Sequence, residues 1–344
     1  MYDVLVTTGA GNVPMGGSDI WVNNFLQYVY PYLDYPIVLL IDGRKPNGFD
    51  PDSIPCQFAF SNDNPDLVHP LLRNARNIHF LHNNYFRRDD LWEYKEKFGI
   101  IFVHAYIKEI INTNIDLGLD RVWLPTSMDL QWEQDVLNQC KQIIWIGCND
   151  GLVQKDFGKK VYNIPNFYEW KEERPYRWLN DKIGYAARSE TRKCFNFLDN
   201  MKGFACTDKI GYENLKEGLD LNLRQIRFYP YSLENHKNFF NLEFTPFHGC
   251  YLNEPFGYSI FNALDYGKLP IIHKYWMPRI KYKYRAGTKE EFQKMYETMC
   301  NDFEAEREYW FNSLKDGLQD YTNKEEWIFE IVNLFNNDSK QKLR

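Results

Sequence analysis

The sequence predicts an α/β protein built from two Rossmann-like domains that face a central cleft. The first observation behind this prediction is the length of 344 residues, which exceeds what one ordinary core holds, because domains average roughly 150 residues. The second is a series of short, continuous apolar runs separated by polar or helical segments, a pattern typical of parallel strands covered on both faces. Ligands of such sheets sit at the carboxyl ends of the strands, so we expect the binding site in the cleft.

The N-terminal domain is expected to span residues 1–170. Its first apolar run, Tyr2–Thr7, leads into a glycine-rich loop and then into a helix from Ser18 to about Tyr30, the order that opens a Rossmann-like unit. Five further apolar runs are predicted to be strands: Ile37–Ile41, Ile78–Leu81, Ile100–Val103, Val122–Leu124 and Ile143–Ile146. The segment Pro165–Pro175 is rich in proline, aromatic and charged residues, which indicates a linker.

The C-terminal domain is expected to span residues 171–322, followed by a helix over 323–344 that packs back on the first domain. Its predicted strands are Ile183–Ala187, Gly203–Thr207, Ile226–Tyr229, Leu242–Phe247 and Leu269–His273. Helices are predicted over Ser189–Met201 and Tyr258–Tyr266, and amphipathic helices over Thr288–Phe335. Together these elements make a second α/β series.

The composition excludes several classes of protein. A chain that is 44% hydrophobic and 26% charged is an ordinary globular one, not a disordered one. No apolar run reaches the roughly 18 residues of a membrane span, and the start MYDVLVTTGAG has no signal-peptide pattern. We therefore expect a cytoplasmic protein, in the host cytoplasm if a phage encodes it. The seven cysteines are scattered and lack zinc-ligand spacing, so we expect reduced thiols and no metal.

The most informative motif is the segment from Glu254 to Ile272. It consists of an acid, Gly257, a helix, the terminating Gly267 and a strand. The exposed N–H groups at the helix start, near Gly257 and Tyr258, form an anion site. The Glu254 carboxylate just before them can accept hydrogen bonds from sugar hydroxyls, and an ordinary helix–strand turn capped by glycine is the alternative.

This segment resembles the donor-binding signature of GT-B glycosyltransferases of the retaining, GT4-like type. The resemblance implies that Glu254 binds the donor and that Asn262 stands where a second Glu usually binds the nucleotide ribose. It also implies a strand, a Gly-Arg and a Lys at the opening of the second domain. Here Arg188 and Lys193 are the matching cations, with Arg192 as a substitute, although the spacing after Gly184 differs from the family's. Such cations neutralise the donor diphosphate as the sugar bond breaks, and a solvated helix start is the alternative.

Within the N-terminal domain the resemblance implies two more groups. Gly16 and Gly17 match glycines that approach the donor phosphates, although the loop fits neither a dinucleotide fingerprint nor a P-loop. His82 follows a predicted strand and matches a histidine that faces the reacting sugar. His104 has a similar setting, and a structural role for either histidine stays open.

A basic, aromatic segment follows the predicted strand that ends at His273. Its cations are Lys274, Arg279, Lys281, Lys283 and Arg285, and its aromatic residues are Tyr275, Trp276, Tyr282 and Tyr284. A second cluster includes Arg87 and Arg88. Cations meet phosphates and aromatic rings stack on exposed bases, so these residues predict a nucleic-acid track. The alternative is a set of solvated strand faces whose rings pack inward.

The chain is also distantly similar to the T-even phage α-glucosyltransferases, in the strand and histidine around Phe80–Asn83, in Val161–Asn163, in Ile183–Gly184 and in the Gly267 turn. This resemblance implies a nucleoside-diphosphate sugar, a UDP-sugar, as co-substrate, retention of configuration, and a flipped-out hydroxymethylated DNA base such as hydroxymethylcytosine as acceptor. The alternatives are a glycan or lipid acceptor, a non-catalytic nucleic-acid-binding or protein-binding module, and a sugar-nucleotide epimerase.

Overall fold

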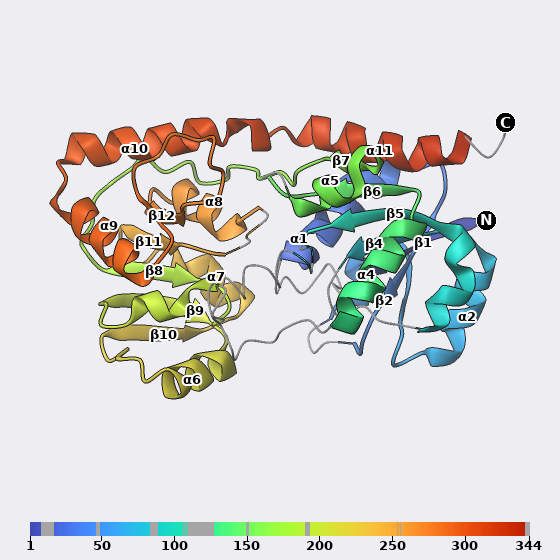
Figure 1. Cartoon of the computed structure of the whole chain (residues 1–344), viewed down its shortest axis with the longest axis horizontal. Coiled ribbons are helices and arrows are strands. Elements are labelled where there is room, and N and C mark those ends of the chain that lie inside the picture. The colour runs from blue at the N-terminus through green and yellow to red at the C-terminus, as the bar shows by residue number, and fades with distance from the viewer. Residues whose placement is uncertain are drawn as a thin grey trace. The chain divides into compact units, whose positions relative to one another are not determined.

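The computed structural model describes residues 1–7, 17–45, 49–82, 89–104, 106, 108, 127–148, 151–189, 193–252, 254 and 256–340 (Figure 1). The chain divides into two compact units. The first unit is drawn from Met1–Asn112, Leu124–Asn166 and Lys324–Arg344, and the second from Thr113–Trp123 and Phe167–Asn323. Each unit contains one parallel sheet, as an α/β fold of two Rossmann-like domains requires.

The sheet of the first unit has the order β3-β2-β1-β4-β5-β6-β7 in the described part of the chain. Its strands are β1 (Tyr2–Thr7), β2 (Ile37–Ile41), β3 (Gln57–Phe60), β4 (Ala75–His82), β5 (Phe98–Val103), β6 (Gln142–Trp145) and β7 (Val161–Asn163). The prediction is confirmed to the residue for β1 and β2, and with shifted ends for β4, β5 and β6. The strands β3 and β7 were not predicted, and the predicted strand Val122–Leu124 lies outside the described residues.

The sheet of the second unit has the order β10-β9-β8-β11-β12-β13 among the described residues. Its strands are β8 (Ile183–Ala186), β9 (Gly203–Thr207), β10 (Ile226–Pro230), β11 (Pro246–Gly249), β12 (Leu269–His273) and β13 (Arg285–Ala286). The order reverses between β8 and β11, as it does between β1 and β4 in the first unit. Each reversal is the switch point at which doubly wound sheets bind ligands.

Helices connect many of the strands, and three helices follow the last strand of the second unit. They are α1 (Gly17–Asn24), α2 (Pro65–Asn74), α4 (Ser127–Gln139), α5 (Leu152–Phe157), α6 (Lys209–Gly218), α7 (Leu233–Phe239), α8 (Tyr258–Asp265), α9 (Lys289–Asn301), α10 (Glu304–Gly317) and α11 (Lys324–Lys340). A π-helical turn at Phe25–Val29 and a 3₁₀ turn at Tyr30–Tyr32 extend α1. Across the described residues, no helix combines the length and the apolar character that crossing a membrane requires.

The last helix, α11, packs its apolar stripe on α1 and the π-helical turn. Trp327, Ile331 and Phe335 are buried and recur every four residues, as one face of a helix requires. The ring of Phe335 lies 5.3 Å from that of Phe25, and the ring of Trp327 lies 6.2 Å from that of Trp21. The red end of the chain and its blue start therefore belong to one unit (Figure 1).

Two predictions in the second unit are wrong. The predicted helix Ser189–Met201 is not formed by residues 193–201, which contain only a 3₁₀ turn at Phe195–Leu198. Cys194, just before that turn, has a left-handed backbone with φ +52°, which a continuous helix does not allow. The predicted strand Leu242–Phe247 begins four residues later, at Pro246.

The buried Lys268 explains the late start of β11. Its ammonium donates to the carbonyls of Leu242 and Phe244, both at 2.9 Å. These carbonyls are therefore bound to a side chain at the point where a strand was predicted. Burial lowers the pKa of Lys268 to about 8.

Candidate donor site of the second unit

Two loops of the second unit start at the switch point of its sheet. Lys193 follows β8 and Glu254 follows β11, and these two strands are neighbours through the pair Gly184 and Phe247. The chain runs outward through β9 and β10 before it returns to form β11, so residues distant in sequence meet here. The carboxyl ends of the two central strands therefore carry the predicted cation and the predicted acid.

The ammonium of Lys193 forms an ion pair with the carboxylate of Glu254. The other carboxylate oxygen of Glu254 accepts a hydrogen bond from the amide of Gly257 at 3.2 Å. The Lys193 ammonium also lies 4.9 Å from the centre of the Tyr251 ring, a favourable cation–π distance. The structure thus brings together three of the predicted donor-site residues, Lys193, Glu254 and Gly257.

Gly257 is the N-cap residue of α8 and has a left-handed backbone with φ +83°. A Cβ at this position would lie 3.2–3.3 Å from Ile260 and from the Trp276 ring, so glycine suits both the conformation and the packing. Its carbonyl accepts from the amide of Ile260 at 2.8 Å. The first turn of α8 thus starts next to Glu254, and its N-terminal amides carry the partial positive charge of a helix start.

Asn262 and Asp265, one turn apart on α8, bind the Tyr168 hydroxyl. The hydroxyl lies 2.6 Å from the Asn262 amide oxygen and 3.1 Å from the Asp265 carboxylate. Burial, together with the Asp265 charge, raises the pKa of Tyr168 far above its ordinary value. Asn262, predicted to bind ribose, therefore has a partner within the unit through its oxygen.

The Asp265 carboxylate also accepts the backbone amides of the chain segment 171–173, at 2.7–3.1 Å. The segment then passes Gly267, where a Cβ would lie 2.4 Å from the Pro175 carbonyl oxygen. Gly267 has φ +71°. The terminating glycine of the motif is therefore required both by its conformation and by the chain that crosses it.

Arg188 and Arg192 complete the predicted cations. The Arg188 side chain is exposed, and its carbonyl accepts a hydrogen bond from the Tyr185 hydroxyl. Arg192 lies outside the described residues. Among the described residues, His, Cys, Asp and Glu side chains do not gather in the groups of three that could hold a metal ion.

The first unit contains the other predicted residues of the donor site. Gly17 begins α1 after β1, and His82 is the last residue of β4, so both lie at the switch point of their sheet. His104 follows β5 and is half-buried. Gly16, Arg87 and Arg88 lie outside the described residues, as does the side chain of His82.

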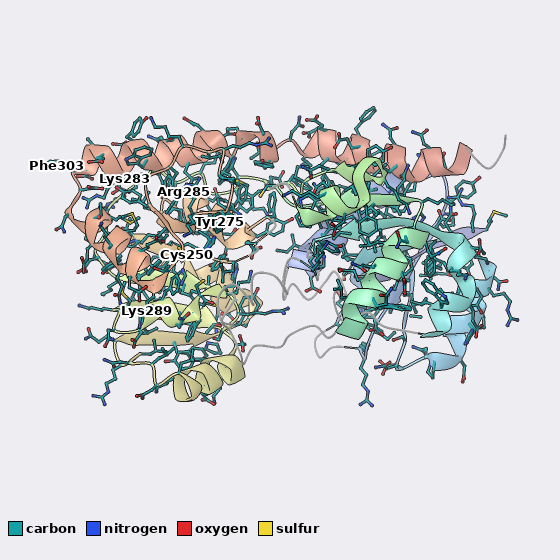
Figure 2. All side chains as sticks on the ribbon, in the orientation of Figure 1. Cys250, Tyr275, Lys283, Arg285, Lys289 and Phe303 are labelled. Carbon is teal, nitrogen blue, oxygen red and sulfur yellow. The ribbon has the colours of Figure 1, made fainter. Side chains whose placement is uncertain are left out.

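The cations of the basic segment after β12 differ in exposure; Figure 2 labels Tyr275, Lys283 and Arg285 of this segment. Lys274, Arg279 and Lys281 are exposed, and the Tyr275 side chain is 70% exposed. The Lys274 ammonium lies 3.9 Å from the Glu291 carboxylate, and the less exposed Lys283 pairs with Asp302 and Glu306.

Arg285 and three of the aromatic rings of this segment are engaged within the protein. Arg285 donates to the carbonyls of Trp276, Met277 and Ile280 at 2.7–2.9 Å. Trp276, Tyr282 and Tyr284 are buried, so the prediction that these rings stack on exposed bases is wrong, and the inward-packing alternative holds for them. Of the four aromatic residues predicted to stack on bases, Tyr275 alone presents its ring to solvent.

Sequence reasoning missed three residues that shape the site: Tyr251 beneath Lys193, Trp276 against Gly257, and His248 in β11. His248 was visible as a polar residue within an apolar run next to the motif. Nothing in the sequence distinguished Tyr251 from core aromatic residues, and Trp276 was assigned to the nucleic-acid track, because the role of each ring depends on which loops meet.

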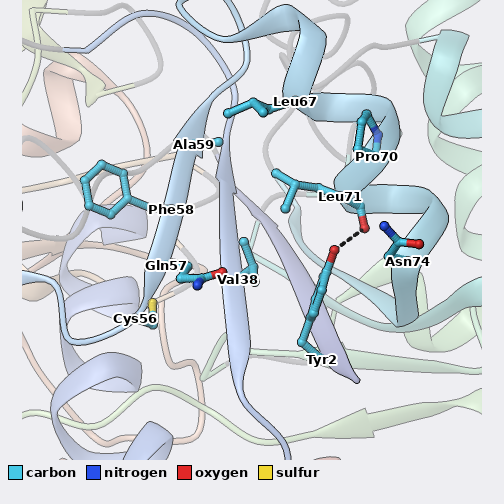
Figure 3. Close-up of a pocket in the computed structure, with 10 residues that line it drawn as sticks. All are labelled: Tyr2, Val38, Cys56, Gln57, Phe58, Ala59, Leu67, Pro70, Leu71 and Asn74. Carbon is cyan, nitrogen blue, oxygen red and sulfur yellow. Dashed lines mark hydrogen bonds between the residues drawn. The ribbon is translucent and has the colours of Figure 1, made fainter.

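A pocket of about 440 Å³ lies elsewhere in the first unit, between α2 and the strands β1, β2 and β3 (Figure 3). It is lined mainly by apolar side chains, including Leu67, Leu71 and Phe58. Tyr2 and Val38 lie near the amino ends of their strands. The pocket therefore lies towards the amino ends of these strands, away from the carboxyl ends at which ligands are expected. It is distinct from the candidate donor site, which belongs to the second unit.

No protein-family model matches this sequence, and a search of curated proteins finds no match. Among solved structures, the chain is similar to sucrose-phosphate synthase from Thermosynechococcus elongatus, with TM-score 0.72, 11% identity, and coverage of 99% of this chain and 100% of that one. It is similar to WaaG, a glycosyltransferase involved in lipopolysaccharide biosynthesis, with TM-score 0.62, 10% identity, and coverage of 97% and 99%. It is also similar to an α-glucosyltransferase in complex with UDP and a 13-mer DNA containing an HMU base, with TM-score 0.60, 10% identity, and coverage of 97% and 99%.

These similarities establish the fold. The structural neighbours are GT-B glycosyltransferases, and the two parallel sheets have the two-domain α/β organisation of that fold. The predicted GT-B fold class is therefore confirmed.

Proposed function

We propose that this protein is a glycosyltransferase that takes its sugar from a nucleoside-diphosphate sugar, a UDP-sugar, at the candidate donor site. The observation that carries the proposal is the meeting of Lys193, Glu254 and Gly257 at the switch point of the second sheet. A cation and a helix start suit a diphosphate, and a carboxylate suits sugar hydroxyls.

The chemistry follows from the charge of the leaving group. When the sugar bond breaks, negative charge builds up on the nucleoside diphosphate, and fixed donors around it stabilise the transition state. In this proposal Lys193 and Arg188 neutralise the diphosphate, the start of α8 binds it, and no metal is required. The GT4-like resemblance further suggests retention of configuration, with same-face attack in which a donor phosphate oxygen helps accept the acceptor proton. The role of His82 near the reacting carbon rests on that resemblance.

Isothermal titration with UDP tests the donor site. We expect wild type to bind UDP and Lys193→Ala to bind it about tenfold or more weakly, because a charge-assisted contact is lost. Arg188→Ala is expected to weaken binding in the same direction. The matched control is Lys202→Ala, which removes an exposed lysine of the same unit. Absence of UDP binding by wild type at millimolar ligand would overturn the proposal.

For the acceptor, we propose a hydroxymethylated base in phage DNA. The support is the exposed set Lys274, Tyr275, Arg279 and Lys281 after β12, together with the likeness to the α-glucosyltransferase solved with DNA. Cations of this kind bind phosphates with a steep salt dependence, and an exposed ring can stack on a base. Binding to duplex DNA that falls steeply with salt, and mass spectrometry of genomic DNA from the source, test this proposal.

A glycan or lipid acceptor is the second candidate, favoured by the likeness to WaaG and by the engagement of Lys283 and Arg285 within the protein. Salt-independent or absent DNA binding would favour it. The remaining alternative is a non-catalytic nucleic-acid-binding module. Hydrolysis of the donor in the absence of acceptor distinguishes it from both enzyme proposals, because only an enzyme performs this reaction.

A further inference from the structure

His248 lies in β11, fully buried, one strand away from the loop that carries Lys193. One of its ring nitrogens, Nδ1, lies 3.1 Å from the amide nitrogen of Cys250, and the other, Nε2, lies 2.8 Å from the carbonyl oxygen of Cys194. An amide can only donate and a carbonyl can only accept, so Nδ1 accepts and Nε2–H donates. The imidazole is therefore neutral and held in one tautomer, and burial lowers the pKa of His248 to about 4.

The carbonyl that His248 binds belongs to the residue next to Lys193. Cys194 has the left-handed backbone with φ +52° described above, a conformation that is unfavourable for a non-glycine residue and persists only when surrounding contacts hold it. The Nε2–H bond is such a contact. It fixes the direction in which the chain leaves Lys193.

The ring of His248 also supports the second partner of Lys193. It stacks on Tyr251 with the ring centres 6.0 Å apart and on Phe197 at 5.8 Å. Phe292 contacts it at 4.6 Å. These rings prevent the imidazole from turning, and Tyr251 is the ring over which the Lys193 ammonium lies.

We propose that His248 is a positioning residue of the donor site: by holding the Cys194 carbonyl, it aims the Lys193 ammonium at Glu254 and the start of α8. The effect on Lys193 follows from the contacts alone. Its consequence for the nucleotide rests on the proposed function.

Two substitutions separate the two hydrogen bonds of the ring. In His248→Asn the side-chain amide reaches about as far as Nδ1, so it can accept from Cys250 but cannot reach Cys194. In His248→Gln the amide reaches about as far as Nε2, so it can donate to the Cys194 carbonyl. Both variants keep a polar, uncharged side chain, which matches them to one another. His236→Ala is the control, because His236 is a half-buried histidine of the same unit that packs on Tyr231 and Phe240.

The first readout is the rate at which an amine-reactive acetyl ester acylates Lys193, measured by peptide mass spectrometry. It needs no nucleotide. We expect His248→Asn to raise the rate about fivefold or more, because Lys193 leaves its ion pair, and His248→Gln and His236→Ala to stay near wild type. The second readout is the Kd for UDP, which we expect to weaken about tenfold in His248→Asn and by less than about threefold in His248→Gln.

The outcomes are distinguishable. A folded His248→Asn variant with the wild-type acylation rate overturns the positioning role, and so does a His248→Gln variant that frees Lys193 as much as Asn does. If wild type binds no UDP, the proposed function fails, while the acylation rates still decide the role of His248. If the Asn variant does not fold, His248→Ala takes its place, because its side chain cannot reach the Cys194 carbonyl either: a raised rate supports the proposal, and a wild-type rate overturns it.

Discussion

Lys193 and Glu254 form an ion pair in which each side chain is only 15% exposed, although 61 positions separate them in the sequence. Without a donor, the carboxylate of Glu254 thus binds both the Lys193 ammonium and the Gly257 amide at the start of α8. A diphosphate would need the same two groups. In the proposed donor site, the Glu254 carboxylate and the diphosphate would therefore compete for Lys193 and the start of α8.

Glu254→Gln is expected to separate nucleotide binding from sugar transfer. The neutral amide no longer pairs with Lys193, so UDP should bind about fivefold more tightly, the equivalent of about 1 kcal/mol. Transfer from the full donor should fall about 100-fold, because the sugar hydroxyls lose their charged acceptor. Titration with UDP and a donor-hydrolysis assay measure the two effects, with the exposed Glu243→Gln as control. Weaker UDP binding by Glu254→Gln would contradict the competition.

Gly257→Ala should damage both stability and nucleotide binding. The added Cβ meets Ile260 and the Trp276 ring at a left-handed backbone, which we expect to lower the free energy of unfolding by about 1–3 kcal/mol. Urea unfolding and UDP titration measure the change. Gly218→Ala is the control, because a Cβ there meets nothing within 4 Å and φ is not positive; equal losses in both variants would show that the fit at Gly257 is unimportant.

Asp3 makes the stability of the first unit depend on pH. Its carboxylate pairs with Arg76, lies 3.5 Å from His79 Nε2, and accepts the amide of Asn77 at 3.0 Å. Burial would raise the pKa of Asp3, but the hydrogen bonds and the charge of Arg76, with the nearby His79 acting in the same direction, outweigh it and hold the pKa well below its ordinary value of 3.8. Because the folded pKa is depressed, the stabilisation is complete above about pH 4 and is lost as the pH falls towards the folded value.

Asp3→Asn should therefore be less stable than wild type at pH 7 by about 3 kcal/mol, because it leaves Arg76 without its buried partner. This gap should narrow as the pH falls from 4 towards 2. Urea unfolding at a series of pH values measures it, with the exposed Asp66→Asn of α2 as the matched change of charge. If the difference in free energy of unfolding between wild type and Asp3→Asn stayed constant with pH, Asp3 would not be the source of the pH dependence.

Lys281 and Arg285 should respond in opposite ways when replaced by alanine. Lys281 is exposed, so Lys281→Ala should leave stability unchanged and reduce the salt slope of DNA binding by about one. Arg285→Ala removes three carbonyl contacts in the loop and should lower the free energy of unfolding by about 2–3 kcal/mol. Thermal unfolding and DNA titration over a range of salt concentrations compare them. Unchanged DNA binding by Lys281→Ala would remove this residue from the proposed acceptor surface.

Much of the fold could be predicted because its strands are continuous apolar runs with clear ends. Residues 3–7 and 37–41 are buried throughout, so the apolar pattern and the strands coincide. The edge strand β3 was missed because only half of its four residues are buried. A short strand with one solvated end has no distinct apolar pattern.

Part of the candidate site could also be predicted from the sequence, and part could not. Glu254, Gly257 and Gly267 lie within one loop and helix, so their spacing alone indicated them. The engagement of Lys283 depends on Asp302 and Glu306, which approach it only after α9 has folded back. A sequence pattern has no means of showing which of several neighbouring cations will find a carboxylate, because that depends on the packing of distant segments.

The position of α11 has a consequence for how the protein is made. Its residues Trp327, Ile331 and Phe335 cover a face of the first unit, yet they are synthesised after the whole of Phe167–Asn323. The second unit is continuous in this stretch and can complete its core while the ribosome is still translating. The first unit therefore cannot complete its core until α11 has been synthesised, and the apolar face around Trp21 and Phe25 stays open to solvent or to chaperones until then.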